Sequence, residues 1–317
     1  MKILVTGGVG FIGSHLSRRL TKEGHEVVII DDLSTDFLAL QELRIANLLQ
    51  GIEIISVSIT DFERLAEIFK QGAFDMVYHL AAKPGVRQSA QYPQTFAQVN
   101  YEGTVNVFEC SRIYNVKHVV FASSSSVYGQ SAQVPFSETF AVNEPISIYA
   151  ATKRAGELLA YTYSVLYNMN ITALRFFTVY GPYGRPDMAP WIFTEKIYND
   201  EPIQVFDNGN HRRDFTYVTD IIDGCVALIH KNLPGYTCFN LGQGKTVELM
   251  YFIEVIEHEL GKNAQRVFTE AQPGDVNVTY ADTTHAKTAF GFEPKVGIED
   301  GMKEFVRWYV TEYKNVG

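Results

Sequence analysis

The sequence predicts an α/β protein built on a parallel, doubly wound sheet of the Rossmann type. Through residues 1–178, short runs of β-branched and other apolar residues alternate with amphipathic stretches of helical length, as in a parallel sheet with crossover helices. Glycines at 7, 10 and 13 directly follow the first apolar run, where a helix should begin. The 317 residues, 46% of them apolar, suffice for one such sheet and a smaller second lobe.

The elements of the first domain follow from this alternation. Each strand is a short apolar run, and the first helix carries Ile12, Leu16 and Leu20 on one side before Gly24 ends it. The expected strands are Ile3–Thr6, Glu26–Asp31, Glu53–Val57, Asp75–Leu80, His118–Ser123 and Ile171–Thr178. The expected helices are Phe11–Lys22, Asp61–Gln71, Val99–Tyr114 and Ser147–Asn168.

The rhythm changes beyond Val179, where prolines and glycines interrupt the chain and the elements become shorter. Helices are expected at Trp191–Asn199, Glu248–Leu260 and Ile298–Tyr313, and strands at Gln204–Phe206 and Asp214–Val218. We therefore divide the chain into a first domain at residues 1–178 and a smaller α/β lobe at 179–317. Whether a segment near residues 214–242 returns to the first domain stays open at this point.

Composition restricts the class of protein. The net charge of -9 argues against a nucleic-acid partner. Cys110, Cys225 and Cys238 have no C-x-x-C spacing, and the eight histidines form no H-x-x-H pair, so we expect neither disulfides nor a metal site. The N-terminus does not resemble a signal peptide, and no apolar run is long enough to span a membrane. We expect a soluble, cytoplasmic protein without a membrane partner.

The glycine triplet predicts a dinucleotide site. Glycines tighten the turn and let backbone amides approach a pyrophosphate at the positive end of the helix. The residues assigned to this site are Gly7, Gly10, Phe11, Ile12 and Gly13. Asp31 ends the second strand, where its carboxylate could accept hydrogen bonds from an adenosine ribose. A plain turn with an exposed aspartate is the alternative. Because no Arg or Lys occurs from Asp31 through Gln41 to neutralise a 2′-phosphate, NAD is favoured over NADP.

The sequence YAATK places Tyr149 and Lys153 four residues apart in an expected helix, on one face. A neighbouring cation stabilises a phenolate, so the pKa of the tyrosine can approach working pH and the phenol can act as acid and base. The alternative is an exposed tyrosine with Lys153 paired to Glu157 one turn further on.

TGGVGFIG, His79–Ala82, Asn100, SSSSVYG and YAATK occur in this order and together resemble the extended short-chain dehydrogenase/reductase family over essentially the whole chain. The resemblance implies that Tyr149 is the general acid/base, that Lys153 holds the nicotinamide ribose, and that Ser124 is the catalytic serine. Further NAD contacts implied by it are Asp32, Ser58, Ile59, Leu80, Ala81, Ala82, Lys83 and Asn100. Ser58 departs from the family, which commonly has an aspartate there for the adenine amino group, so we expect a weaker contact.

Related dehydratases and decarboxylases carry a carboxylate just before VYG, where this chain has Ser125 and Ser126. The chain thus resembles sugar-nucleotide 4-epimerases, in which the tyrosine removes the O4 proton while C4 gives hydride to NAD. The 4-keto sugar then turns over, and hydride returns to its opposite face.

RFFTVYGPYGRPDMA at 175–189 and QPGDV at 272–276 resemble the UDP-glucuronate 4-epimerase group more than the UDP-glucose 4-epimerases. A uronate needs donors near C5, and the candidates are Ser125, Ser126, Thr178 and Arg185. The resemblance further implies Arg213, with Arg212 as second choice, for the diphosphate, Asp275 for the uridine ribose, and Gln204, Val205 and Phe206 for the uracil. Arg87 could touch the phosphates or the carboxylate. Thr178, Arg185 and Arg87 could instead be ordinary structural or surface residues.

Two other kinds of function stay open. One is an epimerase or reductase acting on UDP-glucose, UDP-GlcNAc or a GDP- or dTDP-sugar, which would keep Ser124, Tyr149 and Lys153. The other is a non-catalytic NAD-binding protein on the same fold. By resemblance, the helices at Val99–Tyr114 and Ser147–Asn168 would form a four-helix interface, so we expect a homodimer.

Overall fold

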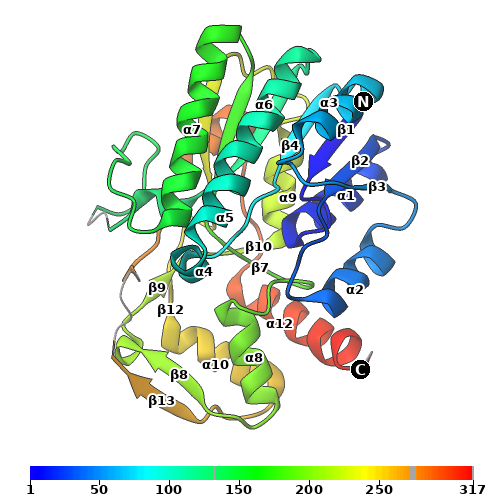
Figure 1. Cartoon of the computed structure of the whole chain (residues 1–317). Coiled ribbons are helices and arrows are strands. Elements are labelled where there is room, and N and C mark those ends of the chain that lie inside the picture. The colour runs from blue at the N-terminus through cyan, green and yellow to red at the C-terminus, as the bar shows by residue number, and fades with distance from the viewer. Residues whose placement is uncertain (131–132, 271–275, 316–317) are drawn as a thin grey trace. The chain divides into compact units, whose positions relative to one another are not determined.

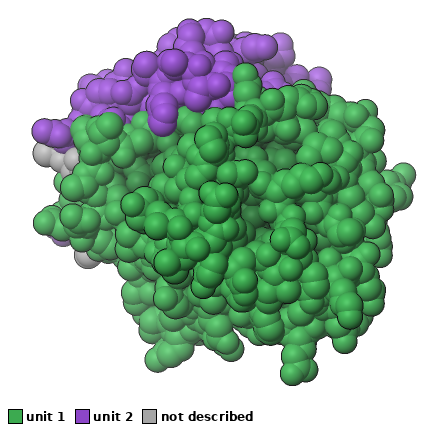
Figure 2. Space-filling view, turned by 90° about the horizontal axis from the view of Figure 1, so that it is seen from above, with its two compact units in different colours: residues 1–131, 138–176, 225–240 green, residues 132–137, 177–224, 241–317 purple. Residues whose placement is uncertain are grey.

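The computed structural model describes residues 1–130, 133–270 and 276–315 (Figure 1). The chain forms two compact units, which Figure 2 shows in different colours. Unit 1 comprises residues 1–131, 138–176 and 225–240. Unit 2 comprises residues 132–137, 177–224 and 241–317. The chain therefore passes from one unit to the other several times.

The centre of unit 1 is a seven-stranded sheet in the order β11-β6-β5-β4-β1-β2-β3, whose pairs from β6 to β3 are all parallel. Its strands are β1 (Lys2–Thr6), β2 (Glu26–Asp31), β3 (Glu53–Ser56), β4 (Met76–His79), β5 (His118–Ser124), β6 (Ile171–Phe176) and β11 (Tyr236–Leu241), the last residue of which belongs to unit 2. The register aligns Leu4 with Val28 and Val77, and Val119 with Ile171, so one row of apolar side chains crosses the sheet.

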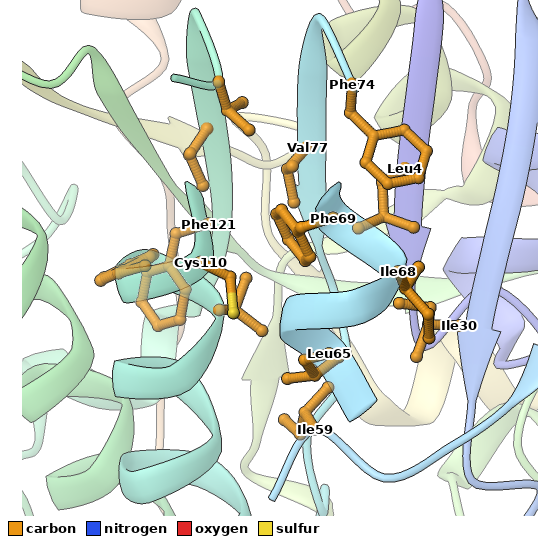
Figure 3. Close-up of a cluster of buried hydrophobic side chains, with 14 of the residues drawn as sticks. Leu4, Ile30, Ile59, Leu65, Ile68, Phe69, Phe74, Val77, Cys110 and Phe121 are labelled. Atoms are coloured by element: carbon orange, nitrogen blue, oxygen red, sulfur yellow. The ribbon is translucent and has the colours of Figure 1, made fainter. Parts of the chain in front are cut away.

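Helices cover this row and complete a core. The long helices of unit 1 are α1 (Phe11–Lys22), α2 (Leu38–Leu48), α3 (Phe62–Gly72), α6 (Gly103–Ile113) and α7 (Ile148–Tyr167). Figure 3 shows Phe69 of α3 beside Val77 and Leu4 of the sheet, Ile68 beside Ile30, and Leu65 near Ile59. Shorter elements are α4 (Val86–Gln91), α5 (Pro93–Ala97), a π-helical turn (Gln98–Glu102) and a 3-10 turn (Ser125–Tyr128).

Helix ends follow the capping residues in the sequence. Ser147 begins α7 by accepting a hydrogen bond from the Ala150 amide, and Asn168 ends it in the left-handed conformation. Asp61 caps α3 in the same way. Gly24, at φ +86°, follows the end of α1, as its position in the sequence predicts.

Unit 2 consists of short strand pairs and helices. Its strands are β7 (Thr178–Tyr180) beside β10 (Phe215–Tyr217), β8 (Ile203–Phe206) beside β13 (Arg266–Thr269), and β9 (Arg212–Arg213) beside β12 (Val247–Glu248). Its helices are α8 (Ala189–Tyr198), α10 (Leu249–Leu260), α11 (Thr284–Phe290) and α12 (Ile298–Trp308), with a π-helical turn at Tyr309–Tyr313 and a 3-10 turn at Asp207–Gly209. Helix α9 (Val218–Ala227) runs from unit 2 into unit 1.

The single strand expected at Ile171–Thr178 is wrong. β6 ends at Phe176, and β7 begins at Thr178 and pairs with β10. The break arises because the Phe177 amide donates to the Leu241 carbonyl while the Thr178 amide donates to the Asp214 carbonyl. In the described residues, no helix is both long and apolar enough to cross a membrane.

Candidate active site

The loop between β1 and α1 requires its glycines. Gly7 has φ +69°, and a Cβ there would lie 2.6 Å from the Ala81 amide nitrogen. A Cβ on Gly13 would collide with the Gly7 carbonyl oxygen. The N-cap residue of α1 is Gly10, which has no side chain to cap the helix. Within the described residues, no other side chain caps this N-terminus, so the amides of the first turn can bind an anion.

Asp31 lies against this loop at the end of β2. One carboxylate oxygen accepts from the Val9 amide at 3.0 Å, and the other accepts from the Leu33 amide at 3.0 Å. Burial raises the pKa of Asp31, although these two amides act in the opposite direction. Asp32, next in the chain, accepts from the amide and hydroxyl of Ser34. The glycine loop, the uncapped helix and Asp31 together fit a dinucleotide.

The catalytic candidates on α7 are close to each other. The Lys153 ammonium lies 5.9 Å from the centre of the Tyr149 ring and donates to the Ala122 carbonyl of β5 at 2.9 Å. Burial lowers the pKa of Lys153 to about 8. The alternative pairing with Glu157 is not formed, because Glu157 binds Ser123, Arg154 and Arg175 instead.

The serine cluster lies at the C-terminal end of β5, the strand that holds Lys153. Ser124 ends β5, and its hydroxyl oxygen accepts from the Ser126 amide at 3.2 Å and from the Ser126 hydroxyl at 2.9 Å. Ser125 and Ser126 begin the 3-10 turn, against which α7 packs. Because Ala122 holds Lys153 two residues before Ser124, the serines and the α7 pair lie at one end of β5.

Asn100 connects the loop after β4 to α7. Its side-chain oxygen accepts from the Lys83 amide at 2.7 Å, and its Nδ2 donates to the Lys83 carbonyl and to the Thr152 hydroxyl. Asn100 belongs to a π-helical turn, an element frequent at functional sites. The Lys83 ammonium donates to Ser34 at 2.5 Å. The loops after β2 and β4 are thereby joined where a dinucleotide would lie.

His79 is a site residue to which sequence reasoning assigned no role. Thr104 donates its hydroxyl hydrogen to the Asn100 carbonyl, so the 3.0 Å contact with Thr104 requires a proton on His79 Nε2. Nδ1 then accepts from the Thr6 hydroxyl at 2.8 Å, and Thr6 accepts from the Ala81 amide. Burial, with the charge of Lys153, lowers the pKa of His79 to about 3. A neutral histidine thus links Asn100 to the glycine loop; the HLAA motif was the available signal.

The remaining NAD candidates lie on loops of unit 1. The Ser58 hydroxyl forms a local turn, at 2.8 Å from the Thr60 hydroxyl and 3.2 Å from the Thr60 amide. The Ile59 carbonyl accepts from Asn106. Leu80 donates its amide to the Thr6 carbonyl, and Ala82 follows in the same loop.

The substrate candidates are divided between the units. Arg87 is an exposed residue of α4 in unit 1. In unit 2, Arg185 binds both carboxylate oxygens of Asp187, and Arg213 of β9 donates to the Asn277 carbonyl at 3.1 Å. Thr178 begins β7, and Gln204, Val205 and Phe206 lie in β8. Asp275 and Gln272 lie outside the described residues. In the described ranges, no group of acidic, histidine or cysteine residues could hold a metal ion.

A Rossmann sheet, a dinucleotide loop, and a serine–tyrosine–lysine set at the end of β5 define a dinucleotide-dependent enzyme that transfers protons and hydride at a hydroxyl-bearing carbon. The comparison of the sequence with family models identifies the family. The chain belongs to the NAD dependent epimerase/dehydratase family, whose model matches residues 3–242.

Named relatives span nearly the whole chain. It is 42% identical to UDP-glucuronate 4-epimerase of Thermodesulfobacterium geofontis, over 96% of this chain and 95% of that protein. Among solved structures, UDP-glucuronic acid 4-epimerase from Bacillus cereus, in complex with UDP-glucuronic acid and NAD, is 34% identical with a TM-score of 0.92 and complete coverage of both chains (100% each). UDP-glucose 4-epimerase of Thermotoga maritima, with UDP-glucose, is 32% identical with the same TM-score of 0.92 and 100% coverage of both chains. The parallel Rossmann-type sheet and the NAD dependence expected from the sequence are confirmed.

Proposed function

We propose that this protein is a UDP-glucuronate 4-epimerase, which interconverts UDP-glucuronate and UDP-galacturonate. The observation that carries the proposal is the Tyr149–Lys153 pair, anchored on the Ala122 carbonyl next to a serine turn without a carboxylate. Relatives named UDP-glucuronate 4-epimerase, 36–42% identical to this chain, support the choice of sugar.

The chain's own residues account for the proton transfers. The Lys153 cation stabilises the phenolate of Tyr149, which takes the proton from O4 and later returns it. Ser124 would hold that hydroxyl group in line with the phenol. NAD bound at the glycine loop would supply the acceptor, and then the donor, of the C4 hydride. Because Ser125 and Ser126 replace the acidic residues of dehydratases, no group at this turn is suited to eliminate water.

We assign recognition of the uronate to Ser125, Ser126, Thr178 and Arg185. The Nε and Nη2 atoms of Arg185 donate to the Asp187 carboxylate. Within the described residues, Nη1 makes no hydrogen bond, so its N–H groups can donate to a substrate carboxylate. The UDP contacts proposed are Arg87, Gln204, Val205, Phe206, Arg213 and Asp275.

We also propose a homodimer in the cytoplasm. Leu158, Tyr161 and Val165 recur at helical spacing on α7, and all three are exposed apolar side chains, as is Ile113 of α6. Such a stripe supports the helical interface expected by family resemblance. All three cysteines are free, which agrees with a reducing compartment.

Proton NMR of the purified protein with UDP-glucuronate tests the proposal. New anomeric and H4 signals of UDP-galacturonate should appear without added cofactor, and Tyr149→Phe should abolish them. Unchanged UDP-glucuronate, with conversion of UDP-glucose or UDP-GlcNAc in the same buffer, would make the protein an epimerase of neutral sugars. Retained NAD with no conversion of any sugar nucleotide would instead favour a non-catalytic role.

A further inference from the structure

One face of α7 carries a third charged group beyond the catalytic pair. Tyr149, Lys153 and Glu157 follow one another at four-residue spacing, so they share that face. The side chain of Glu157 is fully buried, with an exposed fraction of 0%. The side chain of Arg175 on β6 is almost fully buried, with an exposed fraction of 3%. The catalytic chemistry described above uses neither residue.

The Glu157 carboxylate is saturated with donors. Arg175 donates to both of its oxygens, at 2.8 and 2.9 Å, Ser123 donates at 2.6 Å, and Arg154 donates at 3.0 Å. Burial alone would raise the pKa of Glu157, but the hydrogen bonds and charge of Arg175, with Ser123 and Arg154, hold it below its ordinary value. The carboxylate therefore stays ionised.

The network continues from Arg175 to the serine turn. Nη1 of Arg175 donates to the Tyr128 hydroxyl at 2.9 Å, and its guanidinium lies over the Tyr128 ring. The Tyr128 hydroxyl in turn donates to the side-chain oxygen of Asn240 of β11 at 2.7 Å. The backbone amide of Asn240 donates to the Glu138 carboxylate at 2.7 Å. Tyr128 is the last residue of the 3-10 turn that carries Ser125 and Ser126.

The contacts on β5 show what this network controls. Three consecutive residues are involved: Ala122 accepts from Lys153, Ser123 donates to Glu157, and Ser124 is the serine to which we assign the catalytic role. Glu157 thus joins α7 to the strand one residue before Ser124. Through Arg175, the same carboxylate is joined to the end of the serine turn.

We propose that Glu157 and Arg175 are positioning residues, whose ion pair fixes the distance between the Tyr149–Lys153 turn of α7 and the serines that follow β5. A buried ion pair is weak evidence for stability, because two apolar side chains of similar volume often do as well. It does, however, impose a defined geometry on the three segments that it joins. The pair of Glu157 with the fork of Arg175 is bidentate and leaves little freedom in that geometry.

The test is the double variant Glu157→Met with Arg175→Met, because it removes one charge of each sign. The net charge beside Lys153 is unchanged, so a change in the ionisation of Tyr149 reports geometry. That ionisation is read from ultraviolet absorbance of tyrosinate, as the difference from the same protein carrying Tyr149→Phe. Asp75→Asn is the matched control, since Asp75 pairs with Lys117 just before β5, at the opposite end of the same strand.

In the double variant, the melting temperature should stay near that of the wild type, while the pKa of Tyr149 rises by about half a unit or more. The kcat should fall about tenfold with KM nearly unchanged, because a displaced acid/base affects the reaction more than binding. In the control Asp75→Asn, neither the pKa of Tyr149 nor kcat should change. The kcat readout rests on the proposed function, whereas the tyrosine titration does not and decides the matter even if UDP-glucuronate is not the substrate.

Wild-type kcat and wild-type Tyr149 titration in the folded double variant would overturn the proposal and leave the pair a purely structural one. If that variant does not fold, Arg175→Lys replaces it, since lysine keeps the charge but cannot bind Glu157 and Tyr128 with one planar fork. It should show the same upward pKa shift and loss of kcat. Wild-type behaviour of both in Arg175→Lys would equally overturn the proposal.

Discussion

Replacing Lys153 by methionine should separate the stability of the protein from its chemistry. The ammonium lies 5.9 Å from the centre of the Tyr149 ring. If this distance is taken as the separation of the two charges, an effective dielectric constant of about 20 gives the phenolate about 3 kcal/mol of stabilisation. Its loss should raise the pKa of Tyr149 by about 2 units. The same tyrosinate titration, with Tyr149→Phe subtracted in each background, measures this shift.

The folded protein should meanwhile become more stable at neutral pH. Burial lowers the pKa of Lys153 from its ordinary 10.5 to about 8, so the folded state binds the proton less strongly than the unfolded chain. The charged ammonium therefore costs stability in full below pH 8, about 3 kcal/mol, and this cost disappears as the pH rises toward 10.5. Lys153→Met should raise the melting temperature at pH 7 and lose that advantage in alkaline buffer.

Thermal melts across this pH range and the tyrosinate titration are the assays, with the exposed Lys70→Met as the control. A melting temperature below that of the wild type at pH 7 would mean that the Ala122 hydrogen bond outweighs the burial of the charge. A Tyr149 shift of less than about half a unit would refute the electrostatic coupling itself.

Four further outcomes are expected. Gly13→Ala should lose NAD, measured as cofactor released from the purified protein by heat, because its Cβ would collide with the Gly7 carbonyl. Ser58→Asp should retain more NAD in the same measurement, since a carboxylate is a stronger acceptor than the hydroxyl now used in the local turn; equal retention would argue against an adenine contact there. Arg185→Ala should release carbon dioxide and a pentose nucleotide, seen by NMR, because the 4-keto uronate is a β-keto acid whose carboxylate has lost its donor; wild-type product ratios would count against this role. Val165→Glu should shift the protein to monomer in sedimentation, and an unchanged mass would exclude the α7 stripe as the interface.

Local spacing made part of the site predictable from the sequence. The glycines of the first loop, the end of β2 at Asp31 and the pairing of Tyr149 with Lys153 all depend on residues close in the chain. The partner of Lys153 did not follow, because the Ala122 carbonyl becomes available only when β5 lies beside α7. The pairing of Glu157 with Arg175 could not be predicted for the same reason, because the two residues meet only when α7 packs on β6.

Errors in the expected elements have a similar origin. The run ITALRFFT has strand character throughout, and nothing local shows that Phe177 and Thr178 take hydrogen-bond partners near residues 241 and 214. The sequence pattern does not predict helix α9 or strand β11 as elements, although both lie at the segment near residues 214–242. Expected helix ends agree within a residue or two where a cap stands in the sequence, as at Ser147 and Asp61.

The division of the chain into units bears on how such proteins can diversify. Each unit is assembled from three separate stretches of sequence, so a single recombination event between two relatives cannot exchange one unit and leave the other intact. A change of sugar specificity in this lineage therefore cannot come from the exchange of one whole unit in a single such event. Chimeras made at one junction, such as residue 176, should therefore carry a mixed unit 1, lacking its own 225–240 segment, and are poor tools for mapping specificity.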